Sequence, residues 1–120
     1  MKAITLTLLG LLSAGSAWAQ DCTAPQAPTI PDGSSASMEQ MLEGQQAVKT
    51  FQAANSEYMT CLDPQIAAAS ARATAEEASD GDRAALKSLE EAYNAAVSRE
   101  EAVAGEFNKQ IREYKAANPG

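Results

Sequence analysis

The chain has 120 residues, of which 45% are hydrophobic and 5% aromatic, and its formal net charge is −7 without any histidine. An acidic chain repels phosphate backbones and anionic lipid surfaces, which argues against nucleic-acid binding and against binding to a membrane surface. Without histidine there is no imidazole base, and no other catalytic set or Gly-rich phosphate loop is visible, so we expect neither an enzyme nor a bound cofactor.

Residues 1–19 have the pattern of a secretory signal peptide. Lys2 supplies a positive charge, an apolar run too short to span a bilayer follows, and Ala17-Trp18-Ala19 matches a cleavage site. We expect cleavage after Ala19, export to the periplasm and no membrane insertion after cleavage. Loss of Lys2 leaves eight basic and sixteen acidic residues, so the formal net charge of the mature chain becomes −8. The alternative interpretation is a short membrane anchor.

Two cysteines remain after cleavage, Cys22 and Cys61. An even pair of cysteines in an exported protein predicts a disulfide. The two residues are too far apart in sequence to form the C-x-x-C motif of redox sites. A zinc site is not expected either, because the chain has no histidine and no further cysteine.

Residues 20–36 are predicted to form an extended, proline-rich strap. Pro25, Pro28 and Pro31 recur at every third residue, which matches the three-residue turn of polyproline II. The part from Cys22 to Ala36 reaches roughly 45 Å in that conformation at about 3.1 Å per residue, enough to run back along a first helix and bring the two cysteines together. The alternative interpretation is a ligand for a proline-binding domain.

Residues 37–120 are predicted to be helical, starting with Ser37 as N-cap and Gln40 as its capping-box partner. The residues that follow at helical spacing form a stripe that has to be covered by the rest of the chain. This stripe consists of Met41, Gly44, Val48, Phe51, Asn55, Tyr58 and Leu62. Gly44 weakens a helix unless another segment comes close to it. For the polar Asn55 we expect partial exposure, with a role in fixing the helix register as the alternative.

Asp63-Pro64 also has the pattern of a helix start, which would reverse the chain and make a three-helix bundle. The apolar stripe nevertheless continues in phase beyond Pro64, through Ile66, Ala69 and Ala73. We therefore favour a single long helical element that is kinked at Pro64 and runs to about Ser79.

A second long helical pattern covers residues 82–115. Its stripe consists of Leu86, Leu89, Tyr93, Ala96, Val97, Val103, Phe107, Ile111 and Tyr114. We predict a turn at Asp80-Gly81-Asp82, with Gly81 ending one helix and Asp82 capping the next. Folding the chain there places Phe51 opposite Ile111 and Ile66 opposite Ala96. The predicted fold is all-α: a long antiparallel helical hairpin, packed like a coiled coil, with the extended strap at its N-terminus.

Two patterns offer metal ligands. Met38 and Met41 form M-x-x-M, and thioether sulfurs bind Cu(I). Acidic side chains also occur in doublets and as one i,i+4 pair, at Glu76-Glu77, Glu90-Glu91, Glu100-Glu101 and Glu39/Glu43. Adjacent helical residues diverge by about 100°, so we interpret the doublets as solvated surface and the methionines as packing residues, and we expect no metal site.

Several of these features together resemble a group of small exported proteobacterial proteins. The resemblance rests on the P-x-x-P-x-I-P-D-G run from Pro25 to Gly33 and on a set of later residues: Met41, Val48, Tyr58, Cys61, Tyr93-Asn94, Phe107-Asn108, Arg112 and Tyr114. It covers nearly the whole mature chain and implies an envelope location and a helical fold. It implies no functional residue.

We expect a non-catalytic interaction or structural protein of the periplasm that self-associates or docks on a partner helix. A hairpin has a single seam, and a chain spread into long rods buries little apolar area. Apolar positions beside the stripes suggest a second contact surface: Met38, Leu42, Ala54, Val97 and Ala104. The alternative is a carrier of a small ligand or of a metal, either Cu(I) or a divalent cation.

Overall fold

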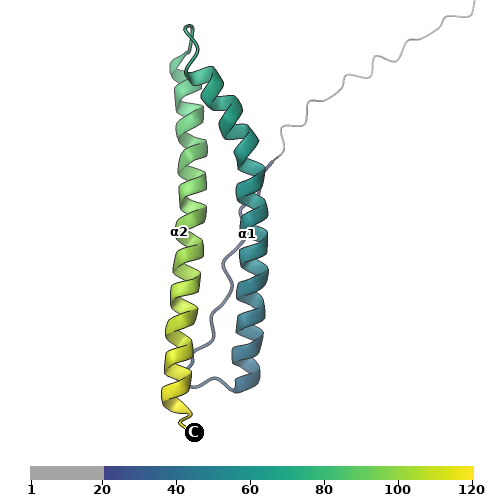
Figure 1. The fold of residues 1–120 in the computed structure, drawn as a ribbon, viewed down its shortest axis with the longest axis vertical. Coiled ribbons are helices and arrows are strands. Elements are labelled where there is room, and N and C mark those ends of the chain that lie inside the picture. Colours follow the sequence, from purple (N-terminus) through teal and green to yellow (C-terminus); the bar gives the residue numbers. More distant parts are fainter. Residues whose placement is uncertain (1–20) are drawn as a thin grey trace, which may run out of the picture.

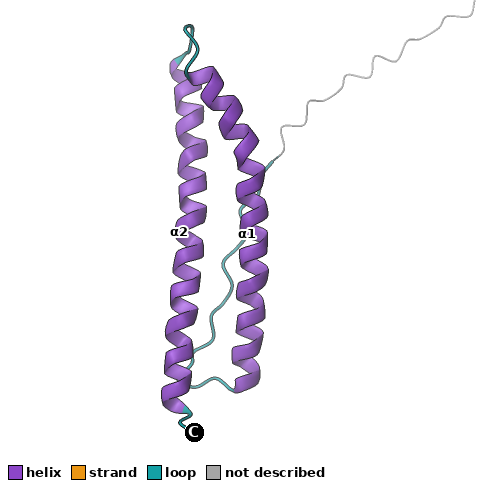
Figure 2. Cartoon of the chain, in the orientation of Figure 1, coloured by secondary structure: helices purple, strands orange, loops and turns teal. Residues whose placement is uncertain are grey.

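In this computed structural model, residues 21–120 are described, and they form two helices and no strand (Figures 1 and 2). Helix α1 spans Met38–Ala73 and helix α2 spans Asp80–Ala117. The two helices lie side by side, run in opposite directions and are joined by a short connection at one end. The all-α prediction is confirmed, and the alternative three-helix bundle does not occur in the described part of the chain.

The predicted signal peptide, residues 1–19, lies outside the described residues. Neither helix in the range 21–120 combines the length and the apolar character needed to cross a bilayer.

The predicted start of the first helix is confirmed. The Ser37 hydroxyl accepts a hydrogen bond from the Gln40 backbone N–H at 3.2 Å, and the Gln40 side chain accepts one from the Ser37 N–H at 2.8 Å. This reciprocal capping box satisfies two of the backbone donors that the first turn of a helix leaves without partners.

Helix α1 continues through Pro64 as one element. Its buried side chains lie on both sides of the proline, with Leu62 before it and Ala69 after it. Packing against α2 therefore continues across the position where proline removes one backbone donor. Figure 1 shows that the last turns of α1 lean toward α2.

The predicted turn at Asp80-Gly81-Asp82 is wrong, because α1 ends earlier, at Ala73, and α2 begins at Asp80. Ser79 caps α2: its hydroxyl accepts from the Asp82 N–H at 3.1 Å, and the Asp82 carboxylate accepts from the Ser79 N–H at 3.0 Å. Asp82 is thus the capping-box partner and not the cap, and Gly81 lies inside the first turn.

The earlier turn changes which residues of the two helices face each other. Ala96 lies against Asn55, to which it is hydrogen-bonded, and not against Ile66 as predicted. The two stripes still meet in one buried cluster. Its buried members are Met41, Val48, Phe51, Val103 and Phe107, and Ile30, Ala36, Ile111 and Tyr114 pack against them. The packing of the two predicted stripes against each other is therefore confirmed.

The expectation that Asn55 is partly exposed is wrong, because its side chain is fully buried. Its amide nitrogen donates to the Ala96 carbonyl oxygen across the seam at 3.0 Å. Its amide oxygen is buried and has no hydrogen-bond partner among the described residues. A buried hydrogen bond of this kind fixes the axial register of α1 relative to α2, as buried asparagines do in coiled coils.

Candidate interaction surface

Residues 21–37 contain no helix and run along the hairpin from the middle of α1 back to its first turn (Figure 2). A disulfide joins Cys22 to Cys61, the pair that the sequence predicts, with Cα atoms 5.7 Å apart. At the other end the segment leads directly into the Ser37 cap of α1.

Gln110 holds the segment to α2. Its side-chain oxygen accepts a hydrogen bond from the Gly33 backbone N–H at 2.8 Å, and its side-chain nitrogen donates to Glu106 at 2.9 Å. Sequence reasoning missed Gln110, because it is polar and does not belong to the apolar stripe. The signal that could have found it is its seven-residue spacing from Val103, which returns to nearly the same face of α2.

Two glycines allow the segment to lie close to both helices. A Cβ atom at Gly33 would overlap with the Gln110 carbonyl oxygen, and a Cβ atom at Gly44 would lie 2.7 Å from the Pro31 ring. Gly33 therefore touches the backbone of α2, and the Pro31 ring fills the space that Gly44 leaves on α1. The condition that the sequence set for Gly44, close approach of another segment, is met.

The other side of the hairpin has no such covering segment among residues 21–120. It is defined by residues that recur at steps of seven, which return to within about 20° of the same face of a helix. We call this side the open face. On α1 it contains Met38, Leu42, Gln45, Lys49, Gln52, Ser56, Met59, Asp63 and Ile66. On α2 it contains Glu90, Asn94, Val97, Glu101, Ala104, Asn108, Ile111, Lys115 and Asn118.

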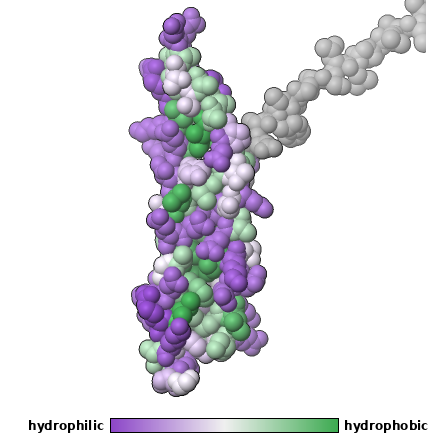
Figure 3. All heavy atoms as spheres, in the orientation of Figure 1, coloured by the Kyte–Doolittle hydropathy of each residue, from purple (hydrophilic) through white to green (hydrophobic). Residues whose placement is uncertain are grey.

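Figure 3 shows hydrophobic residues in separate patches at several levels of the displayed side, with hydrophilic residues between and around them. In the same orientation, the extended segment runs between the ribbons of the two helices and passes behind α1 over part of its course (Figure 1). The displayed side of the hairpin therefore has several exposed hydrophobic patches.

One groove of the open face lies at the end of the hairpin where α1 begins. Its volume is about 500 Å³, and its lining includes Met38, Leu42, Ile111, Tyr114 and Lys115. Met38 is 56% exposed and Leu42 57% exposed, and these are the large hydrophobic side chains with the greatest exposure in the described chain. The groove is thus apolar with one cationic side chain at its margin.

A second groove of the open face lies nearer the connection between the helices. Its volume is about 370 Å³, and it is lined by Asp63, Ile66, Glu90, Tyr93 and Asn94. This groove combines the hydrophobic side chain of Ile66 and the ring of Tyr93 with two acidic residues, Asp63 and Glu90. Sequence reasoning did not identify this groove, because Asp63 and Glu90 come together only through the register of the hairpin.

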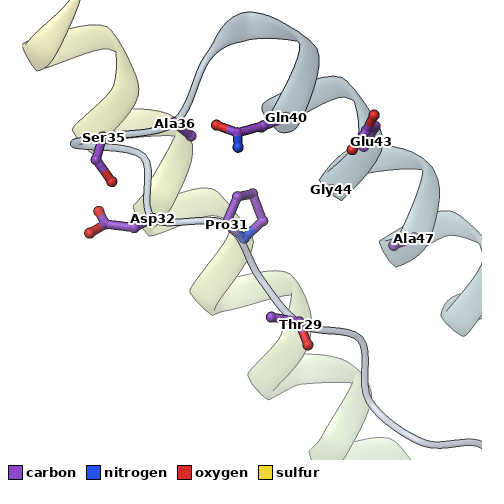
Figure 4. A pocket seen from close by; sticks show the side chains of 9 residues that line it. All are labelled: Thr29, Pro31, Asp32, Ser35, Ala36, Gln40, Glu43, Gly44 and Ala47. Atoms are coloured by element: carbon purple, nitrogen blue, oxygen red, sulfur yellow. The ribbon is translucent and has the colours of Figure 1, made fainter.

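A polar pocket of about 390 Å³ lies between the extended segment and α1, and Figure 4 shows its lining side chains. Its lining residues include Asp32 and Glu43. Ser34 donates to Asp32 from its hydroxyl at 2.6 Å and from its backbone N–H at 3.0 Å, and these bonds lower the pKa of Asp32 below its ordinary value of 3.8. The Asp32 carboxylate therefore stabilises the turn at Gly33 by accepting both hydrogen bonds from Ser34.

The candidate metal ligands are spread over the surface. Met41 is buried in the core, whereas Met38 is more than half exposed. The paired acidic residues are mostly exposed, and residues 21–120 hold no group of three or more carboxylate or cysteine side chains placed to bind a metal ion.

Comparison with known proteins gives no family assignment. A scan against protein-family models and searches of curated proteins and of solved structures found no match to this chain.

Proposed function

We propose that this protein is a non-catalytic interaction protein of the cell envelope, and that it binds another protein through the open face of its helical hairpin. The observation that carries the proposal is the apolar groove at Met38 and Leu42, which leaves both side chains more than half exposed. Large exposed apolar patches framed by polar residues are typical of protein-binding sites.

In this proposal residues 21–36 act as a strap that fixes the geometry of the binding face. The hydrogen bond between Gly33 and Gln110 and the contact between Pro31 and Gly44 support that role, because they connect the segment to both helices. Pro64 produces the bend of α1, since proline removes one backbone donor and its ring crowds the preceding turn. The bend keeps the end of α1 in contact with α2.

The envelope location rests on the sequence. Residues 1–19 read as a signal peptide. A disulfide between Cys22 and Cys61 agrees with export, because disulfides persist in oxidising compartments. The resemblance to small exported proteobacterial proteins points to the same compartment, and the native host expressing the full-length chain is therefore the right setting for a test.

Site-specific photo-crosslinking in such cells tests the proposal. A photo-crosslinking amino acid replaces Leu42 in the groove, and the same residue replaces Glu57 as the matched control. Glu57 is exposed on α1 and lies outside the open face. Adducts of defined mass from position 42, and none from position 57, are the expected result. Equal labelling at both positions, or no adduct at position 42, would overturn the proposal.

A further inference from the structure

We propose that the occupant of the open face is a second copy of this chain, bound antiparallel and face to face. This inference rests on the proposed function and names the partner that the open face binds. Three properties of the described residues carry it: the continuity of the face, the separation of its charges, and the register of the two helices.

The two grooves belong to one continuous surface. On α1, one row of seven-residue steps leads from Met38 in the first groove to Ile66 in the second. On α2, a corresponding row leads from Glu90 in the second groove to Ile111 in the first. Between the two grooves these rows carry half-buried side chains, namely Gln52, Met59, Val97 and Ala104. A helix of a partner can therefore lie along the whole face.

The two ends of this surface carry opposite charges, and Lys49 and Glu101 lie between the ends at nearly one level. Lys115 lines the apolar groove at one end, and Asp63 and Glu90 line the groove at the other end. A parallel pairing of two such faces would place like charges at the same level. An antiparallel pairing places Lys115 of each copy beside the acidic groove of the other. The two ends of the contact are then complementary to each other, as a twofold interface requires.

The axial register of α1 and α2 allows one twofold axis to generate the proposed contacts of both helices. The contacts of Asn55 with Ala96 and of Gly44 with Phe107 set which residues of α1 and α2 lie at the same level.

By that register, the midpoint between Leu42 and Met59 on α1 lies within one helical turn of the midpoint between Glu90 and Lys115 on α2. A single axis at this level therefore brings Leu42 onto Met59 of the second copy and Lys115 onto Glu90 of the second copy. The product is a four-helix bundle with a strap on each outer side.

Charge reversal, measured by sedimentation of the mature, disulfide-bonded protein, tests this arrangement. Lys115→Glu and Glu90→Lys are each expected to raise the dimer dissociation constant by about tenfold or more, because each places like charges together. The double variant, which restores opposite charges in the reversed sense, is expected to bind within about threefold of the unchanged protein. Lys109→Glu is the matched control, since Lys109 is exposed on α2 outside the open face.

The outcomes separate this inference from the proposed function. Weakening by both single variants with rescue by the double variant supports the antiparallel dimer. Weakening without rescue, or an effect no larger than that of Lys109→Glu, overturns it. A mature protein that stays monomeric at its highest soluble concentration also overturns it. If crosslinks from position 42 then capture a different protein, the proposed function stands and only the identity of the partner is wrong. Helical circular dichroism confirms that each variant is folded.

Discussion

The side-chain oxygen of Gln110 accepts a hydrogen bond from the backbone N–H of Gly33, a residue 77 positions earlier in the chain, at 2.8 Å. Both partners are buried, and the bond closes the extended segment over the seam between α1 and α2. One side of the hairpin is thereby covered by the chain itself, whereas the open face has no such cover within residues 21–120.

Replacing Gly33 with alanine is expected to destabilise the protein by about 1–3 kcal/mol, because the new methyl group would overlap with the Gln110 carbonyl oxygen and push the segment off α2. Gly105→Ala is the matched control, since a Cβ atom there meets nothing within 4 Å. It is expected to stabilise α2 by up to about 1 kcal/mol, because alanine favours the helix. Chemical denaturation measures both changes, and a neutral Gly33→Ala would contradict the close approach.

Removing the disulfide is expected to lower the free energy of unfolding by about 2–4 kcal/mol, because the bond closes a loop between residues 39 positions apart. The double substitution of Cys22 and Cys61 by serine and chemical reduction of the unchanged protein should give similar losses. The substituted protein should be insensitive to reductant. A melting temperature unchanged by both treatments would show that the strap is held without the disulfide.

Asn55→Asp is expected to cost about 3 kcal/mol or more, because it buries a charge and removes the donor to the Ala96 carbonyl oxygen. Asn55→Leu keeps the branching at Cγ but is larger, and it is expected to cost less than Asn55→Asp, because it buries no charge and removes an amide oxygen that has no hydrogen-bond partner among the described residues. Equilibrium unfolding of the two variants compares them directly. Equal losses of stability in the two variants would contradict the claim that a buried charge costs more at this position than a nonpolar side chain.

Stability is expected to fall in acid partly through Asp82. Hydrogen bonds from the Ser79 backbone and hydroxyl lower the pKa of Asp82 below its ordinary value of 3.8 in the folded protein. A lowered folded-state pKa means that this stabilisation is present above the ordinary value and is lost as the pH falls through the lowered one. The difference in unfolding free energy between the unchanged protein and Asp82→Asn should therefore shrink in strong acid. A difference that is constant with pH would contradict this role.

The two stripes of apolar residues could be predicted from the sequence, because helical spacing and the need to cover an apolar face depend only on residue order. The cap at Ser37 and Gln40 could be predicted for the same reason, since its hydrogen bonds are local. The connection between the helices could not, because Ser79-Asp80-Gly81-Asp82 contains two competing caps. The sequence favoured Asp82 after a terminating glycine, whereas the structure uses Ser79 with Asp82 as its partner.

The candidate site was predictable only in part. Met38 and Leu42 could be identified as apolar positions beside the stripe, and both are exposed. The acidic groove at Asp63 and Glu90 depends on the register across the seam, and the predicted register was shifted by the misplaced turn. The roles of Gln110 and Asn55 depend on contacts between distant segments, for which hydropathy gives no signal.

Methionine oxidation in cells offers the most direct test of the central claim, that a partner covers the open face. Isolated mature protein at high dilution and protein in intact cells are oxidised briefly, and the sulfoxide at each methionine is quantified by mass spectrometry. Met38, which is 56% exposed, should oxidise readily in the isolated chain and be protected in cells. The buried Met41 should resist oxidation in both settings and serves as the internal control. Equal oxidation of Met38 in the two settings would contradict the account, because an open face without a partner would be equally accessible in both.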